Sequence, residues 1–93
     1  MWYLRRVTGD SMNPNYRDGQ VVLVSYLGRY SVGDVVVALM DGREVIKRIS
    51  KMSRGKFYLV GDNLHNSTDS RTHGWIMETH LMGRVVWPRR NNL

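Results

Sequence analysis

The amino-acid sequence predicts an all-β fold, mostly β with little helix, formed by a single domain over residues 1–93. Short runs of β-branched, aliphatic and aromatic residues recur along the chain, as expected of strands. Turn-forming Gly, Asp, Asn and Pro residues separate these runs at short intervals, which is typical of small β domains. A chain of 93 residues is too short for two domains, so any active site must be built on one small core.

Five strands are expected in chain order. Residues 20–26 and 34–40 are rich in β-branched and aliphatic side chains, and residues 43–49 alternate between polar and apolar positions. Residues 56–60 combine aromatic and aliphatic side chains, and residues 83–87 close the series. The sequence therefore predicts a small sheet with short connections.

The Asp41-Gly42 pair lies between the second and third of these runs and predicts a two-residue hairpin loop. A type I′ turn needs positive φ at both central residues, which Asp and Gly tolerate. Such a loop fixes the register, because opposite residues then pair in order away from the turn. We expect Val36 to pair with Lys47, so that the lysine shares one face of the hairpin with Val36, Ala38, Val45 and Ile49.

Lys47 is a candidate general base because of this apolar face. An amine among aliphatic side chains loses hydration, and its pKa falls below the usual value of about 10.4. A neutral lysine can then accept a proton. The alternative is a strand lysine that extends its amine to solvent, and the strand alone favours this alternative.

Ser11 is a candidate nucleophile in a turn. Residues 8–15 surround it with Gly9, Asp10, Asn13 and Pro14, so we expect a tight turn at this serine. An ordinary turn serine that hydrogen-bonds its own backbone is the alternative. Only a nearby buried base would favour catalysis over this structural role.

Residues 61–71 form a second polar block, which follows the fourth expected strand. A hydroxyl such as Ser67 can orient a neutral amine, and carboxylates such as Asp62 and Asp69 can hold guanidinium groups with two hydrogen bonds. The alternative is a polar surface loop with side-chain turns.

The composition of the chain limits the classes of partner that it could bind. Fourteen Lys and Arg against eight Asp and Glu give a net charge of +6, which would attract nucleic acid, acidic proteins or an anionic membrane. These basic residues are dispersed, so we expect no nucleic-acid partner, although a basic nucleic-acid-binding module without catalysis stays an alternative. Trp2, Trp75 and Trp87 on a basic surface would allow peripheral membrane contact.

The apolar runs are far shorter than the roughly 18 residues of a membrane span, so no membrane span is expected and a cytoplasmic location is the default. No cysteine is present, which fits a reducing compartment. His65, His73 and His80 lack the usual spacing of metal ligands, so we expect no metal, no cofactor and surface or loop positions for these histidines.

Four motifs together resemble the type I signal peptidase family, over residues 7–86. They are Gly9-Asp10-Ser11-Met12-Asn13-Pro14, Gly33-Asp34-Val35-Val36-Val37, Lys47-Arg48, and Gly61-Asp62-Asn63 continuing to Ser67-Thr68-Asp69-Ser70-Arg71. The last block is the most specific, because the related LexA-type self-cleaving repressors share the other three but generally lack it. The resemblance implies a coiled antiparallel β-sheet, or half-barrel, of the signal peptidase I catalytic core type.

The resemblance also implies roles for individual residues. Ser11 would be the nucleophile, Lys47 its general base, and Ser67 the hydroxyl that orients the lysine amine. Asp62 would pair with Arg48, Asp69 and Arg71 would form a second buried ion pair, and Met12 and Pro14 would shape the turn. The Ser11 backbone N–H would hold part of the oxyanion. Gly9 stands where some family members carry a serine, so the second oxyanion donor is open.

Only ten residues precede Ser11 and twelve separate Arg48 from Gly61. Because type I signal peptidases normally carry a membrane anchor and often a large inserted β domain, this chain is expected to be the catalytic core alone. Its length and its ending, residues 83–88, resemble the short soluble branch of nickel-type superoxide dismutase maturation proteases. The expected partner is a precursor protein with an N-terminal extension, and a LexA-type self-cleaving regulatory domain stays an alternative.

Overall fold

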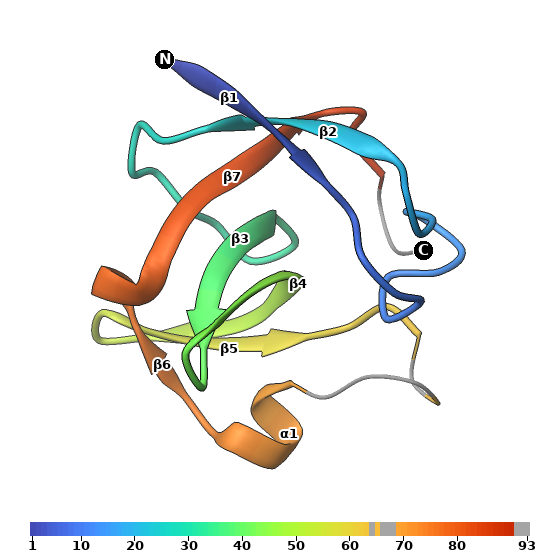
Figure 1. The fold of residues 1–93 in the computed structure, drawn as a ribbon. Coiled ribbons are helices and arrows are strands. Elements are labelled where there is room, and N and C mark those ends of the chain that lie inside the picture. Colours follow the sequence, from blue (N-terminus) through green and yellow to red (C-terminus); the bar gives the residue numbers. More distant parts are fainter. Residues whose placement is uncertain (64, 66–68, 91–93) are drawn as a thin grey trace.

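The computed structural model describes residues 1–63, 65 and 69–90, and in this part of the chain seven strands form one antiparallel sheet (Figure 1). The strands are β1 (Trp2–Arg6), β2 (Val21–Ser25), β3 (Val35–Met40), β4 (Arg43–Ser53), β5 (Lys56–Val60), β6 (Ile76–Met77) and β7 (Leu81–Trp87). The helical elements are α1 (Ser70–His73) and the 3-10 turn η1 (Glu78–His80). The all-β prediction is confirmed.

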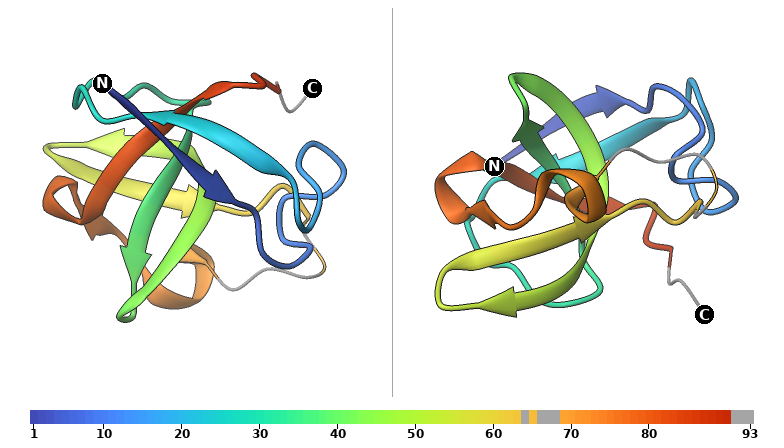
Figure 2. Two further views of the ribbon diagram at one scale, coloured as in Figure 1. Left: turned by 45° about the horizontal axis from the view of Figure 1, so that its top comes forward. Right: turned by 90° about the horizontal axis from the view of Figure 1, so that it is seen from below.

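The strand order is β1-β2-β7-β3-β4-β5-β6, so the last strand of the chain lies between β2 and β3. Every neighbouring pair is antiparallel. The sheet curls around its core without closing, with β1 at one edge and β6 at the other (Figures 1 and 2). Neither described helix is long and apolar enough to cross a membrane.

Strand β3 lies at the centre of the core, and all of its residues except Leu39 are buried. Val35 and Val37 pack in one apolar cluster with residues of β2 and of the segment after β1. Val36, Ala38 and Met40 point the other way and pack in a second cluster with residues of β4, β5 and β6. Successive side chains of a strand alternate between faces, so one strand serves both clusters.

The β3–β4 hairpin has the register that the sequence predicts. Val36 pairs with Lys47, Ala38 with Val45 and Met40 with Arg43. Asp41 and Gly42 both have positive φ, 53° and 73°, as a type I′ turn requires. The sequence-based placement of Lys47 on the apolar face is therefore confirmed.

The prediction of five strands was incomplete. Strand β1 was missed because it is an edge strand whose Trp2 and Leu4 are exposed, so its sequence lacks the alternation of a half-buried strand. Strand β6 has only two residues, which leaves no period to detect. Strand β4 continues beyond residue 49 to Ser53, because its second half pairs with β5.

Candidate active site

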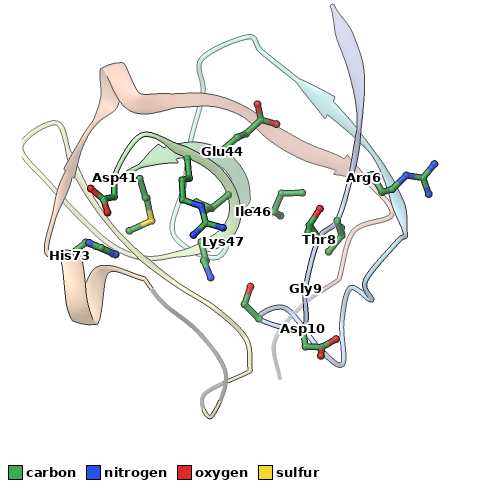
Figure 3. Close-up of a pocket in the computed structure, with 14 residues that line it drawn as sticks. Arg6, Thr8, Gly9, Asp10, Asp41, Glu44, Ile46, Lys47 and His73 are labelled. Atoms are coloured by element: carbon green, nitrogen blue, oxygen red, sulfur yellow. The ribbon is translucent and has the colours of Figure 1, made fainter.

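A pocket of about 810 Å³ opens between the segment that follows β1 and the β3–β4 hairpin (Figure 3). Ser11 and Lys47 both line it, although they are 36 positions apart in the sequence. Its other lining residues are Arg6, Val7, Thr8, Gly9, Asp10, Met40, Asp41, Arg43, Glu44, Val45, Ile46 and His73. The fold thus brings the candidate nucleophile and the candidate base to one cavity.

Ser11 lies in a turn between β1 and β2, as expected, and is partly buried. The Asn13 backbone N–H donates to the Asp10 carbonyl over 3.1 Å and closes this turn. Before the serine, the Gly9 N–H donates to the Asp18 carboxylate over 2.7 Å, which holds Gly9 at a φ of 83°. This positive φ suits glycine, since most other residues are strained there.

Gly9, at the position where some family members carry a serine, lines the pocket, whereas Met12 and Pro14, the residues implied to shape the turn, are not among its lining residues. Met12 is 1% exposed and packs in the first apolar cluster, so it anchors the turn from the core side. Pro14 follows a cis peptide bond from Asn13.

The turn is also tied to the loop after β5. The Asn63 backbone N–H donates to the Ser11 carbonyl over 2.8 Å, and the Asn63 side-chain amide donates to the Asp10 carbonyl over 3.1 Å. The Asn15 side chain donates to Asp62 over 2.9 Å. These three bonds connect the segment around Ser11, the candidate nucleophile, to a segment about fifty residues later in the chain.

Lys47 is 4% exposed and extends from β4 into the space beside the loop that carries Gly9 and Asp10 (Figure 3). Burial removes water from its amine and lowers the pKa of Lys47 below the usual lysine value. The negative charge of Asp69 acts in the opposite direction, and the positive charge of Arg71 lowers this pKa further. Burial is the largest of the three effects, so the neutral amine is favoured relative to a solvated lysine.

Arg48, the next residue on β4, forms a bidentate ion pair with Asp62, with two contacts of 2.8 Å. Its guanidinium also donates to the Gly33 carbonyl over 2.8 Å. The Asp62 side chain has no exposed surface, and the Arg48 side chain is 8% exposed. Both charges are therefore removed from water together, which is tolerated only when they are paired.

Asp69 and Arg71 form a second ion pair, with contacts of 3.0 and 2.6 Å. Asp69 also caps α1 by accepting from the Arg71 backbone N–H, and it accepts from the Gly61 N–H over 2.8 Å. The carboxylate is fully buried, but the Arg71 side chain is 37% exposed. Ser67, the hydroxyl expected to orient the Lys47 amine, lies outside the described residues, so this role stays a prediction.

Sequence reasoning gave no role to several residues that the structure places around the site. Asn63 binds the turn that carries Ser11, Asn15 binds Asp62, and the Tyr16 backbone N–H donates to the Met12 carbonyl at the end of that turn. The density of Asn residues near Ser11 was a usable signal for turn hydrogen bonds, but it does not reveal the partners.

The three histidines are exposed, and His73 lies at the rim of the pocket near Asp41 (Figure 3). Within residues 1–63, 65 and 69–90, no group of three or more His, Cys, Asp or Glu side chains is arranged to hold a metal ion.

Comparison with known proteins gives the family. The family model described as Peptidase S24-like matches residues 1–86. The chain belongs to the Peptidase S24-like family. Its membership supports a serine-type peptidase of the signal peptidase type, in agreement with the motifs around Ser11 and Lys47.

Two related sequences are mitochondrial inner membrane protease subunit 1 from Xenopus tropicalis and from Mus musculus. The frog protein is 32% identical over 111 aligned positions, which cover 87% of this chain and 66% of the relative. The mouse protein is 39% identical over 59 positions, which cover 60% of this chain and 35% of the relative. The chain thus spans less than two thirds of the length of either protein.

Proposed function

We propose that this member of the Peptidase S24-like family is an endopeptidase with a Ser/Lys dyad, in which Ser11 is the nucleophile and Lys47 the general base. One observation carries the proposal: Ser11 and Lys47 line the same pocket, and Lys47 is buried with a lowered pKa. A turn serine beside a solvated lysine would be inert, whereas a desolvated amine can take the hydroxyl proton.

The reaction is acyl transfer in two steps. The neutral Lys47 amine takes the proton of the Ser11 hydroxyl while the serine oxygen bonds to the scissile carbonyl carbon. The resulting ammonium returns this proton to the leaving amine as the carbon–nitrogen bond breaks. Lys47 then takes a proton from water as the water oxygen bonds to the acyl carbon, and it returns this proton to the Ser11 oxygen as the ester bond breaks. The Ser11 N–H is the proposed first oxyanion donor, and the second stays open.

An extended peptide would reach this dyad along a free strand edge. Residues 43–47 of β4 pair with β3 on one side, whereas β5 pairs with β4 only from Arg48 onward. In the described part of the chain, the other edge of residues 43–47 carries no strand and lines the pocket. A substrate segment can add main-chain hydrogen bonds along such an edge, which suits a protease that reads an unfolded precursor.

The proposed reaction is removal of an N-terminal pro- or signal segment from a precursor protein. The related sequences carry the name of a protease subunit, which agrees with proteolysis. Nickel-type superoxide dismutase with an N-terminal extension is the candidate precursor, suggested by the resemblance to the short soluble branch. The cytoplasmic location also stays a prediction.

A cleavage assay with matched variants tests the dyad. The protein is incubated with a diverse peptide library and with the extended dismutase precursor, and new termini are identified by mass spectrometry. Ser11→Ala and Lys47→Ala should each abolish cleavage. Ser53→Ala and Lys51→Ala, which change an exposed serine and an exposed lysine on β4, should cleave like the wild type.

Two results would contradict the dyad. Cleavage that survives Lys47→Ala but is lost in His73→Ala would assign the base to the histidine at the pocket rim. Salt-sensitive binding of nucleic acid that survives Ser11→Ala, without cleavage of any peptide, would favour the basic binding module. Cleavage of its own chain alone would favour a self-cleaving regulatory domain.

A further inference from the structure

The segment that follows β7, residues 88–90, hydrogen-bonds to Tyr16, which follows the turn that carries Ser11, and to the side chain of Arg48 on β4. The Tyr16 hydroxyl donates to the Pro88 carbonyl over 2.7 Å and accepts from the Arg90 backbone N–H over 3.2 Å. The Arg48 guanidinium donates to the Arg90 carbonyl over 2.8 Å. We call residues 88–90 the strap; all three of these contacts use its backbone.

One end of the strap is joined to the turn that carries Ser11. The Tyr16 backbone N–H donates to the Met12 carbonyl over 3.0 Å, one residue beyond Ser11. The Tyr16 residue is 1% exposed and packs with Met12 and Val7 in the first apolar cluster. Burial raises the pKa of the Tyr16 hydroxyl, so it stays a hydrogen-bond donor at neutral pH.

The other end of the strap is joined to the strand that carries Lys47. Arg48 follows Lys47 directly and points to the opposite face of β4, where its guanidinium binds Asp62 and the strap. Asp62 in turn accepts from Asn15, which precedes Tyr16 in the nucleophile turn. These contacts form a closed ring of interactions, which runs from the turn through the strap, Arg48 and Asp62 back to the turn.

We propose that residues 88–90 position the Ser11 turn relative to Lys47, with Tyr16 as the positioning residue through which the strap acts. This inference rests on the proposed function, because it assigns a catalytic purpose to the alignment of Ser11 with Lys47. Proton transfer needs the two groups within hydrogen-bond reach, and a misplacement of about 1 Å can reduce the rate by about a hundredfold.

Because the contacts use the backbone of the strap, the Tyr16 hydroxyl should matter for alignment and the Arg90 side chain should not. Tyr16→Phe keeps the buried ring but removes both hydrogen bonds to the strap. Arg90→Ala keeps the backbone N–H and carbonyl that bind Tyr16 and Arg48, and it removes only an exposed side chain. The two variants therefore separate loss of the strap from loss of a nearby charge.

Steady-state cleavage of one peptide from the library assay tests the proposal, at a temperature where circular dichroism shows every variant folded. Tyr16→Phe should lower kcat by about 10- to 100-fold with KM changed less than about threefold, because alignment and not substrate binding is lost. Arg90→Ala and Tyr26→Phe, which removes an exposed hydroxyl, should match the wild type. A chain that ends at Trp87 should show the same kcat loss as Tyr16→Phe.

Three outcomes would overturn the proposal. A wild-type kcat in Tyr16→Phe, or an equal loss in Arg90→Ala, would show that the backbone strap does not align the dyad. A rise in KM at unchanged kcat would assign the segment to substrate binding instead. Equal cleavage by wild type and Ser11→Ala in the same assay would overturn the proposed function itself, and the role of the strap with it.

Discussion

Two ion pairs lie near Lys47, and they differ in burial and in what they connect. Arg48 and Asp62 are both buried, with side-chain exposures of 8% and 0%. Asp69 is equally buried, but its partner Arg71 is 37% exposed. The first pair joins β4 to Gly33, the strap and Asn15, whereas the second joins two residues of the polar block at the start of α1.

The two pairs therefore have different expected roles. The Arg48–Asp62 pair holds segments of the chain together, whereas the Asp69–Arg71 pair sets the charge around Lys47. Arg48 donates to three segments that are distant in the sequence, so its guanidinium organises the surroundings of the nucleophile turn. The charges of Asp69 and Arg71 act on Lys47 in opposite directions and alter its pKa. We therefore expect substitutions in the first pair to affect folding, and substitutions in the second to affect the pH dependence of activity.

The largest effect is expected from Arg48→Met. This variant leaves the buried Asp62 carboxylate without its guanidinium, and loss of one partner of a buried pair usually costs about 3–5 kcal/mol. Small domains are stable by about 5–15 kcal/mol, so the variant should lose a substantial share of its free energy of unfolding. Urea unfolding followed by circular dichroism measures the change.

The matched control is Arg5→Met. Arg5 of β1 pairs with Glu44 of β4, but both side chains are more than one third exposed. Exposed pairs contribute about 0.2–1 kcal/mol, so this variant should unfold at nearly the wild-type urea concentration. Equal losses in the two variants would show that burial does not distinguish the pairs.

A smaller effect is expected from Arg71→Gln, and chiefly on activity, because Arg71 is partly hydrated and Asp69 keeps the Gly61 and Arg71 backbone N–H donors. Arg71 lowers the pKa of Lys47, so removal of its charge should raise that pKa and leave more of the lysine protonated at a given pH. The acidic limb of the kcat/KM profile should move to higher pH, and activity at neutral pH should fall about two- to tenfold. Activity on the alkaline plateau should be unchanged.

The control for this variant is Arg29→Gln, which removes an exposed charge from the connection between β2 and β3. Its pH profile should match that of the wild type. A profile of Arg71→Gln that falls uniformly at all pH values would mean that the guanidinium holds the loop in place instead of tuning the base.

The sequence predicted the hairpin side of the site better than the loop side. The register of β3 and β4 follows from the Asp41-Gly42 turn and from the period of two along a strand, both of which are local. The place of Lys47 on an apolar face could be derived from that register, but the burial of its amine could not, because a strand lysine can extend its amine to solvent. The edge strand β1 could not be predicted, because its exposed Trp2 and Leu4 depart from the usual alternation of polar and apolar residues.

The loop side depends on contacts between distant segments. Asn63 binds the Ser11 turn, and Tyr16 binds the strap 72 positions later. Such hydrogen bonds leave no period in the sequence, because one polar residue in a turn looks like any other. The two ion pairs were expected only because the motifs resemble a known family, and the resemblance gave no role to the strap.

The smallest effect is expected from Lys47→Met on the pH dependence of stability. The folded pKa of Lys47 is lowered, so between that pKa and the usual value the unfolded chain binds more protons, and stability rises with pH. Methionine removes this contribution, so the difference in stability between wild type and variant should change in favour of the wild type as pH increases from 7 to about 9.5. The range stops there because the raised pKa values of Tyr3, Tyr16 and Tyr30 lower the stability of both proteins above pH 10. Urea midpoints of the two proteins at each pH measure the difference.

The control is Lys51→Met, on the exposed part of β4, which should keep the pH dependence of stability of the wild type. A wild-type pH dependence in Lys47→Met as well would show that burial does not favour the neutral amine.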